Sequence, residues 1–279
     1  MVNTTEDIKK FINDKSLKKI FVLCGKKSFV TSGAENLFKK IITDKEIKLF
    51  YKKSELPILE ELIEIINDIK NFKPDLILAV GGGAVIDYAK IANVVDVRED
   101  LADLIVNYSY PFKKKYTKLT VIPTTAGSGA EVTSNAVIYV DGIKHSFESE
   151  LLIPDNFFLI PEFLISAPNK IKASAGFDAI AQALESLISK KSNVQSVEYA
   201  SKSLRVSINS FISFIKDKKL FTDIFNDLDA YSTLWLLDFF DTKDSNAWAI
   251  ASKPADALIL FGAEIKNSGI KKKLSGTNN

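Results

Sequence analysis

Three consecutive glycines, Gly81 to Gly83, directly follow a short apolar run and limit what this chain can fold into. The stretch reads PDLILAVGGGAVIDYAK over residues 74–90. Its LILAV run has the length and composition of a buried strand, and a helical pattern begins near Ala84. A helix that starts beside a strand end directs its first amides, which carry partial positive charge, toward whatever lies above the sheet edge. On this stretch alone, a pyrophosphate site and a tight turn that needs a positive φ angle are equally good interpretations.

A second small and polar segment, PTTAGSGAE over residues 123–131, follows the next apolar run, LTVI, in the same way. Open α/β sheets bind nucleotides in the crevice at the carboxyl ends of neighbouring strands. Two such loops after successive strands therefore favour a pyrophosphate site over a simple turn. The pattern is not GxGxxG, so it does not match the ordinary Rossmann fingerprint.

The first half of the chain alternates short apolar runs with amphipathic ones. Besides the run before the glycines, Ile20–Cys24, Ile47–Tyr51 and Leu119–Ile122 have the composition of buried strands. The segment Glu55–Lys70 is helical in its spacing. Its apolar residues at three- and four-residue steps are Leu59, Leu62, Ile63, Ile66 and Ile69. This order predicts a parallel sheet with helices on both sides.

A hairpin and a helical region follow. Val137–Val140 and Ile143–Phe147 flank the turn pair Asp141-Gly142, which is typical of a β-hairpin. Beyond Pro161 the strand signals stop. Helical apolar spacing recurs in residues 175–189, 194–217, 229–240 and 246–265. We therefore predict an α/β dinucleotide-binding domain over residues 1–160 and a helical domain over residues 161–279.

Composition excludes several classes of protein. With 46% apolar and 26% charged residues the chain is globular, and its 37 basic and 35 acidic side chains nearly cancel. The lysine runs 113–115 and 271–273 are too short to indicate nucleic-acid binding, and we interpret them as solvated loop or tail. No window approaches ~18 uninterrupted apolar residues, so no membrane span is expected. A single cysteine, Cys24, and a polar start without an apolar signal region predict a cytoplasmic protein.

Three motifs in order resemble those of the iron-containing (group III) alcohol dehydrogenases, whose relatives include glycerol dehydrogenase and dehydroquinate synthase. GGGAVIDYAK is similar to GGGSxxDxAK, PTTAGSGAEVT to PTTAGTGSEVT, and SAGFDAIAQALES to GxDAxxHAxE. The resemblance implies a Rossmann-like NAD(P)-binding domain, an all-helical C-terminal domain and hydride transfer in the cleft between them. It also implies cofactor contacts at Gly81, Gly82, Gly83, Asp87, Thr124, Thr125 and Ser128.

The end of the first predicted strand bears on the choice of cofactor. NAD-preferring members of this family often place an aspartate there, which would repel a 2′-phosphate. Here the strand ends in Gly25 and is followed by Lys26 and Lys27, so a negative charge is missing and two positive charges are added. We expect Gly25 and Lys26 to lie beside the cofactor, which favours NADP(H) over NAD(H). The alternative is that both lysines simply point into solvent.

The metal site is where the resemblance fails. Family members hold a divalent ion with an aspartate, a histidine four residues later and two further histidines. Asp178 matches the aspartate, but Gln182 takes the first histidine position, and Trp248 and Ser252 replace a ligand and a proton-relay histidine. The last ligand position falls near Gly262. Zinc and ferrous iron need several converging nitrogen, sulfur or carboxylate donors, so we predict no metal. The chain is thus expected to be a short member of the family, with a truncated helical domain and no ligand histidines.

Without an ion, another group must polarise the substrate oxygen. Lys253 lies where an ammonium near Asp178 can act as a fixed positive charge and proton donor, and Gln182 can donate a hydrogen bond. The alternatives are a surface lysine and a glutamine that only packs between helices. The single histidine, His145, falls in the hairpin, where a structural or exposed position is favoured over a catalytic one.

These features leave two main hypotheses for function. The first is a metal-independent NAD(P)-dependent oxidoreductase for a hydroxyl or carbonyl substrate, including a biosynthetic tailoring enzyme for a peptide or sugar-derived substrate. The second is a catalytically inactive nucleotide-binding homologue that serves as a sensor or partner subunit. A scaffold with a vestigial pocket is disfavoured by the two intact loops. An apolar face on the helical domain predicts a homo-oligomer or a partner subunit.

Overall fold

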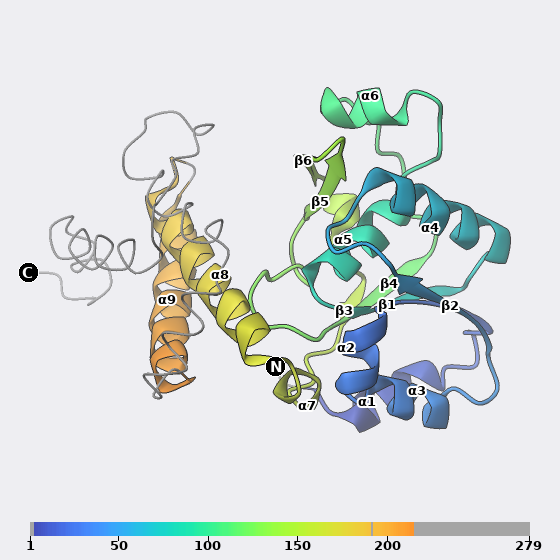
Figure 1. Ribbon diagram of the computed structural model, residues 1–279, viewed down its shortest axis with the longest axis horizontal. Coiled ribbons are helices and arrows are strands. Elements are labelled where there is room, and N and C mark those ends of the chain that lie inside the picture. Colours follow the sequence, from blue (N-terminus) through green and yellow to red (C-terminus); the bar gives the residue numbers. More distant parts are fainter. Residues whose placement is uncertain (1–2, 191, 215–279) are drawn as a thin grey trace, which may run out of the picture. The chain divides into compact units, whose positions relative to one another are not determined.

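The computed structural model describes residues 3–190 and 192–214. The chain divides into two compact units. The first holds Met1–Thr125 and Gly129–Ala167, and the second holds Ala126–Ser128 together with the chain from Pro168 onward. In Figure 1 the first unit is the α/β body and the second contains the helices α8 and α9.

The first unit is built on a five-stranded sheet in which every described pairing is parallel. In spatial order its strands are β2 (Glu46–Lys52), β1 (Lys19–Gly25), β3 (Leu76–Gly81), β4 (Lys118–Pro123) and β7 (Asn156–Phe157). β3 lies at the centre and is buried along its whole length, as its unbroken apolar run requires. The predicted parallel sheet and its first four strands are confirmed. β7 was not predicted, because two residues carry no readable periodicity.

Helices cover both faces of the sheet, as the alternation of strands and helices predicted (Figure 1). One face carries α4 (Leu59–Phe72) and α5 (Gly83–Ala92), with α6 (Leu101–Val106) adding side chains to the same core. The other face carries α1 (Thr5–Ile12), α2 (Lys26–Thr31) and α3 (Ala34–Ile41). The strands divide their side chains between the two cores because successive residues point to opposite faces. In β1, for example, Phe21 belongs to the first core and Val22 to the second.

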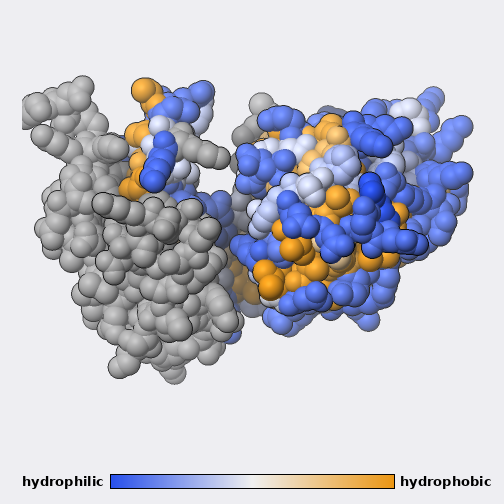
Figure 2. All heavy atoms as spheres, turned by 90° about the horizontal axis from the view of Figure 1, so that it is seen from above, coloured by the Kyte–Doolittle hydropathy of each residue, from blue (hydrophilic) through white to orange (hydrophobic). Residues whose placement is uncertain are grey.

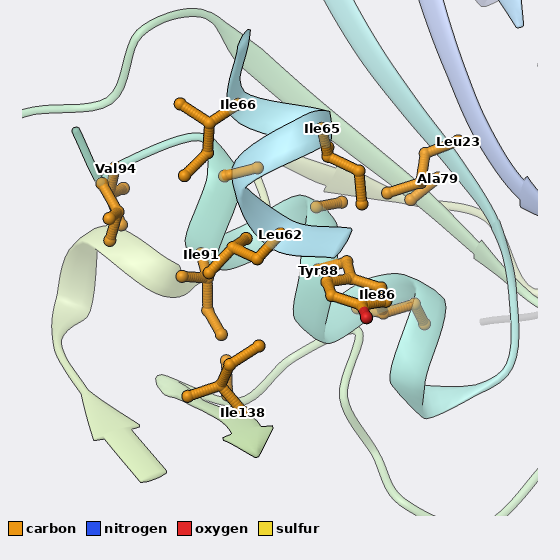
Figure 3. Packing of buried hydrophobic residues seen from close by; sticks show 14 of the residues in the cluster. Leu23, Leu62, Ile65, Ile66, Ala79, Ile86, Tyr88, Ile91, Val94 and Ile138 are labelled. Atoms are coloured by element: carbon orange, nitrogen blue, oxygen red, sulfur yellow. The ribbon is translucent and has the colours of Figure 1, made fainter. Parts of the chain in front are cut away.

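The core on the α4 side is shown in Figure 3, where Leu62 of α4 lies toward Ile91 of α5 and Ile65 lies toward Ala79 of β3. The helix begins at Leu59 rather than Glu55, and its buried face includes the carboxylate of Glu61.

The Glu61 carboxylate is buried because it has several hydrogen-bond donors. It accepts the backbone N–H groups of Lys53 at 2.5 Å and Ser54 at 3.0 Å, and the Tyr88 hydroxyl donates to it at 3.0 Å. Burial alone would raise the pKa of Glu61, but these hydrogen bonds hold it below its usual value. The apolar pattern predicts Ile63 on this face, but Ile63 is only partly buried, whereas Ile65 is completely buried.

The predicted hairpin is confirmed as β5 (Asn135–Val140) paired antiparallel with β6 (Ile143–Glu148). Both turn residues have positive φ, 50° at Asp141 and 77° at Gly142, as a two-residue hairpin turn requires. Its inner face adds Ile138 to the core around α5 (Figure 3). His145 also faces inward and is only 7% exposed, and neither ring nitrogen has a hydrogen-bond partner among the described residues.

After the hairpin a short 3-10 helix (Glu150–Leu152), β7 and α7 (Glu162–Ile165) complete the first unit. The second unit contains α8 (Asn169–Ile188) and α9 (Val194–Phe214), which pack through Phe177, Leu184 and Leu204. These helices confirm the helical prediction for 175–189 and, as far as residue 214, the prediction for 194–217. The predictions for 229–240 and 246–265 lie outside the described residues.

The α/β unit is largely hydrophilic on the face seen in Figure 2, with apolar areas among the polar side chains. Within the described residues no helix is long and apolar enough to cross a membrane. The lysine run at 113–115 was interpreted as solvated, but Lys115 has defined partners. Its ammonium donates to the Ile153 carbonyl at 2.6 Å and to the Asp155 carboxylate at 2.8 Å.

Candidate functional site

The glycine triplet forms the junction between β3 and α5. Gly81 ends the strand, Gly82 is the N-cap of the helix, and Gly83 is its first residue. Among the described residues the glycines with positive φ are Gly33, Gly129 and Gly142, so no member of the triplet needs the left-handed region. The tight-turn interpretation that relied on positive φ is therefore wrong.

Close approach explains two of these glycines instead. A Cβ at Gly81 would lie 2.6 Å from Cγ2 of Val85, which is closer than real Cβ contacts. A Cβ at Gly82 would lie 3.3 Å from Oγ1 of Thr125. No side chain caps the start of α5 in the described chain, so its first amides face the space beyond the strand end. Such a bare helix start is suited to bind an anion such as a pyrophosphate.

The second loop begins beside the first. Gly81 pairs with Pro123 in the β3–β4 register, and the Thr124 N–H donates to the Gly81 carbonyl at 2.9 Å. Thr124 is 3% exposed, and its hydroxyl has no hydrogen-bond partner among the described residues. A buried polar group without a partner costs about 1–3 kcal/mol, which a ligand oxygen would remove. The glycines and Thr124 thus fit the phosphates of a dinucleotide.

Asp87 lies one turn into α5 and faces the hairpin. Its carboxylate accepts the backbone N–H of Val137, and burial raises its pKa to about 7 against the opposing effect of Lys90. In the structure Asp87 therefore ties α5 to β5. A contact between Asp87 and the cofactor, which the resemblance implies, stays a prediction.

The end of β1 lies at the same edge of the sheet as the glycine triplet, since β1 pairs with β3 in parallel. Gly25 is the last residue of β1 and the N-cap of α2, and the side chains of Lys26 and Lys27 are exposed. The neighbouring Cys24 is buried, and burial together with the charge of Glu35 raises the pKa of its thiol to about 12. Cys24 is therefore an inert core residue rather than a nucleophile.

The tip of the second loop, Ala126–Ser128, belongs to the helical unit. A Cβ at Gly127 would lie 2.4 Å from the carbonyl oxygen of Ala175 in α8, so only glycine fits there. Ser128, a predicted cofactor contact, is part of this tip and is half-buried. Thr125 stays with the α/β unit beside Gly82.

Asp178 and Gln182 lie one turn apart on α8, as predicted, and the Gln182 amide donates to the Asp178 carboxylate at 2.9 Å. A carboxylate and an amide are too few donors to hold zinc or iron tightly. Among the described residues no group of three His, Cys, Asp or Glu side chains is placed to bind a metal ion. The only histidine of the whole sequence, His145, is in the other unit. The residues at this site do not fit the imidazole-bound ion of the family pattern.

The remaining predicted residues of this region, Lys253, Trp248, Ser252 and Gly262, lie outside the described residues. One residue was missed in the quoted motif itself. Lys90 closes GGGAVIDYAK and is completely buried. The signal was a lysine three residues after Asp87, followed directly by the apolar pair Ile91 and Ala92.

Comparison with known proteins agrees with this geometry. The family model described as iron-containing alcohol dehydrogenase matches residues 2–161, which is more than half of the chain. The chain is 30% identical over 178 residues to 1-propanol dehydrogenase of Citrobacter freundii, covering 63% of this chain and 45% of that protein. It is 29% identical over 223 residues to 4-hydroxybutyrate dehydrogenase of Clostridium kluyveri, covering 77% and 59% of the two chains. The chain thus spans about half the length of the curated relatives it matches.

Solved structures show the same fold. NADH-dependent butanol dehydrogenase A of Thermotoga maritima superposes with a TM-score of 0.68 at 24% identity, covering 77% of this chain and 55% of that chain. Sulfoacetaldehyde reductase of Bifidobacterium kashiwanohense, solved with NAD+, gives a TM-score of 0.61 at 25% identity and covers 74% and 58% of the two chains. From the family match and this shared fold, the chain belongs to the iron-containing alcohol dehydrogenase family.

Proposed function

We propose that the chain binds NAD(P)(H) at the start of α5 and acts as a metal-independent oxidoreductase on a hydroxyl or carbonyl substrate. The observation that carries the proposal is the buried hydroxyl of Thr124, which has no partner within residues 3–190 and 192–214 and lies beside the glycine junction of β3 and α5. A phosphate oxygen would supply the missing partner of Thr124 and meet the first amides of α5.

The relatives support a nicotinamide cofactor. One similar structure is named as NADH-dependent and another was solved with NAD+. The curated relatives are named as dehydrogenases of alcohols and of a hydroxy acid. Because the chain covers only about half of these proteins, their activity is proposed for it rather than transferred.

The cofactor, when bound, supplies a hydride donor or acceptor at its nicotinamide ring. The protein must then stabilise negative charge on the substrate oxygen and give or take its proton. We assign these tasks to the amide of Gln182 and the ammonium of Lys253, with Asp178 orienting Gln182 through the 2.9 Å hydrogen bond. We further propose NADP(H) as the preferred cofactor, on the basis of Gly25, Lys26 and Lys27.

One observation favours a second candidate, a catalytically inactive nucleotide-binding homologue. The Gln182 amide is engaged with Asp178 at the position where the family pattern has a metal-ligand histidine. If the hydrogen bond between Gln182 and Asp178 only stabilises α8, the protein would bind the nucleotide but would not catalyse a reaction. Turnover of any alcohol or aldehyde by protein stripped of metal would decide for the enzyme.

Thr124 offers the direct test of the cofactor site. We expect Thr124→Val to weaken NADPH and NADH binding about tenfold, or ~1.4 kcal/mol, by removing one hydrogen bond to a charged oxygen. Isothermal titration calorimetry measures both dissociation constants without requiring a substrate.

Thr120→Val is the matched control. Thr120 lies inside β4, whereas Thr124 directly follows the end of that strand. Thr120 is also buried, and its hydroxyl too has no partner among the described residues. Its substitution should leave nucleotide binding unchanged. Equal affinities for wild type and Thr124→Val would show that the Thr124 hydroxyl does not bind the phosphates. If the wild type binds neither nucleotide, the proposed function is wrong.

A further inference from the structure

A buried ammonium fastens α5 to the segment that follows the second loop. Lys90 is 0% exposed. Its Nζ donates to the Thr133 carbonyl at 2.8 Å, to the Thr133 hydroxyl at 3.0 Å and to the Asn135 carbonyl at 2.8 Å. An ammonium carries three N–H bonds, so each of them has an acceptor. All three acceptors lie where the second loop runs into β5.

We infer that Lys90 is a positioning residue for the cofactor site: it holds the second loop against α5 and thereby sets the affinity for the nucleotide. This inference rests on the proposed function, because that loop carries Thr124 and Thr125. It concerns a residue that does not itself reach the phosphates. Lys90 lies seven residues beyond Gly83, which is about 10 Å along the helix axis.

The energetic cost of burying Lys90 argues for a specific role. Burial disfavours the charged form and lowers the pKa of Lys90 to about 8, although Asp87 and Glu131 act in the opposite direction. Neighbouring positions on α5 are filled by apolar side chains such as Ile91 and Ala92, which pack without such a cost. A methionine would fill the same space. What it lacks is the set of three donors.

The hydrogen bonds fix the second loop at both of its ends. At its start the Thr124 N–H donates to Gly81, directly before α5. Past its end Lys90 holds Thr133 and Asn135, and Asp87 accepts from Val137. Both attachments lead to the β3–α5 segment whose junction forms the candidate phosphate site. Without Lys90 these three hydrogen bonds would be lost, and binding a nucleotide would have to order more of the loop.

Lys90→Met removes the donors and keeps an unbranched side chain that is one heavy atom shorter. In the absence of nucleotide we expect amide hydrogen exchange of residues 129–135 to rise about tenfold, and the dissociation constant of the preferred nucleotide to rise by a similar factor. The control is Tyr88→Phe on the same helix. It removes a buried hydroxyl that contacts Ile58 and Glu61 but leaves the second loop untouched.

The paired measurements separate the possible outcomes. If Lys90→Met and Tyr88→Phe show the same exchange in residues 129–135 and the same affinity, Lys90 is only a core residue and the inference is wrong. If wild type binds no nucleotide, the proposed function fails, whereas the exchange comparison still reports on the attachment by Lys90.

A second variant covers the case in which Lys90→Met does not fold. Thr133→Val removes one of the three acceptors and keeps both backbone carbonyls. We expect exchange and dissociation constant each to rise about two- to fivefold. Wild-type values for both in a folded Thr133→Val protein would also overturn the inference.

Discussion

The start of α5 and the middle of α8 belong to two motifs of the same family, yet they differ in how much substitution they tolerate. At α5 the candidate site consists of main-chain amides, and contacts with Val85 and Thr125 leave little room for any side chain at Gly81 and Gly82. At α8 the family site consists of side-chain donors, and Gln182 in place of a histidine changes the chemistry while the helix continues unbroken. A binding site formed by main-chain amides is kept as long as the packing around it is kept. A site formed by side chains is lost when one of those residues is replaced.

The largest effect should come from filling the backbone site. Gly82 has φ −77°, which any residue can adopt, and a Cβ there would meet only the side chain of Thr125, so the fold should accommodate Gly82→Val by a small shift of Thr125. Its side chain would occupy the space beside Thr125 and block the first amides of α5. We expect nucleotide affinity to fall about 100-fold or more, or at least ~2.7 kcal/mol, with Gly82→Ala between this variant and wild type. Titration calorimetry measures the dissociation constant. If Gly82→Val bound the nucleotide as tightly as wild type, the start of α5 would not be the binding site and its contrast with α8 would be lost.

A smaller effect should follow from restoring the negative charge at the end of β1. Gly25→Asp should weaken NADPH about tenfold relative to NADH, because a carboxylate repels the 2′-phosphate and accepts the ribose hydroxyls. Gly25→Asn has the same size without the charge and is the control. Equal loss of both nucleotides in both variants would show that size rather than charge matters at Gly25.

The smallest effect is expected at α8. Removal of divalent ions with a chelator should leave the melting temperature unchanged and the nucleotide affinity within about twofold, because Asp178 and Gln182 offer too few donors to retain an ion. Metal analysis of protein prepared without chelator should find far less than one equivalent. If the protein instead held one equivalent of metal, and removing that metal lowered the melting temperature, the α8 site would bind an ion and the contrast between the two sites would be wrong.

Periodic features of the fold were predictable from sequence. Four strands, the α4 helix and the Asp141-Gly142 turn depend on local patterns, and the structure confirms them. Features created by distant partners were not predictable. The buried carboxylate of Glu61 depends in part on the hydroxyl of Tyr88, which lies 27 positions away in the chain.

The same distinction applies to the candidate site. The motif positions of the glycines and Thr124 could be predicted, but the reason for the glycines could not, because it depends on contacts with Val85 and Thr125 rather than on φ. Lys90 was missed because its acceptors are 43 and 45 positions away in the chain. The cofactor contacts of Asp87 and Ser128 and the roles of Lys253 and Gln182 stay predictions, as does a division at residue 160.

The position of Gly127 also limits how the protein can be divided into separately folded fragments. Because Ala126–Ser128 sits with α8 while the sequence on either side belongs to the α/β body, the polypeptide crosses from one unit to the other after Thr125, after Ser128 and again after Ala167. Cleaving it once cannot yield two intact halves. A fragment ending at Ala167 would contain Gly127 but lack α8, against which Gly127 packs. The two units should therefore be expressed together in one chain.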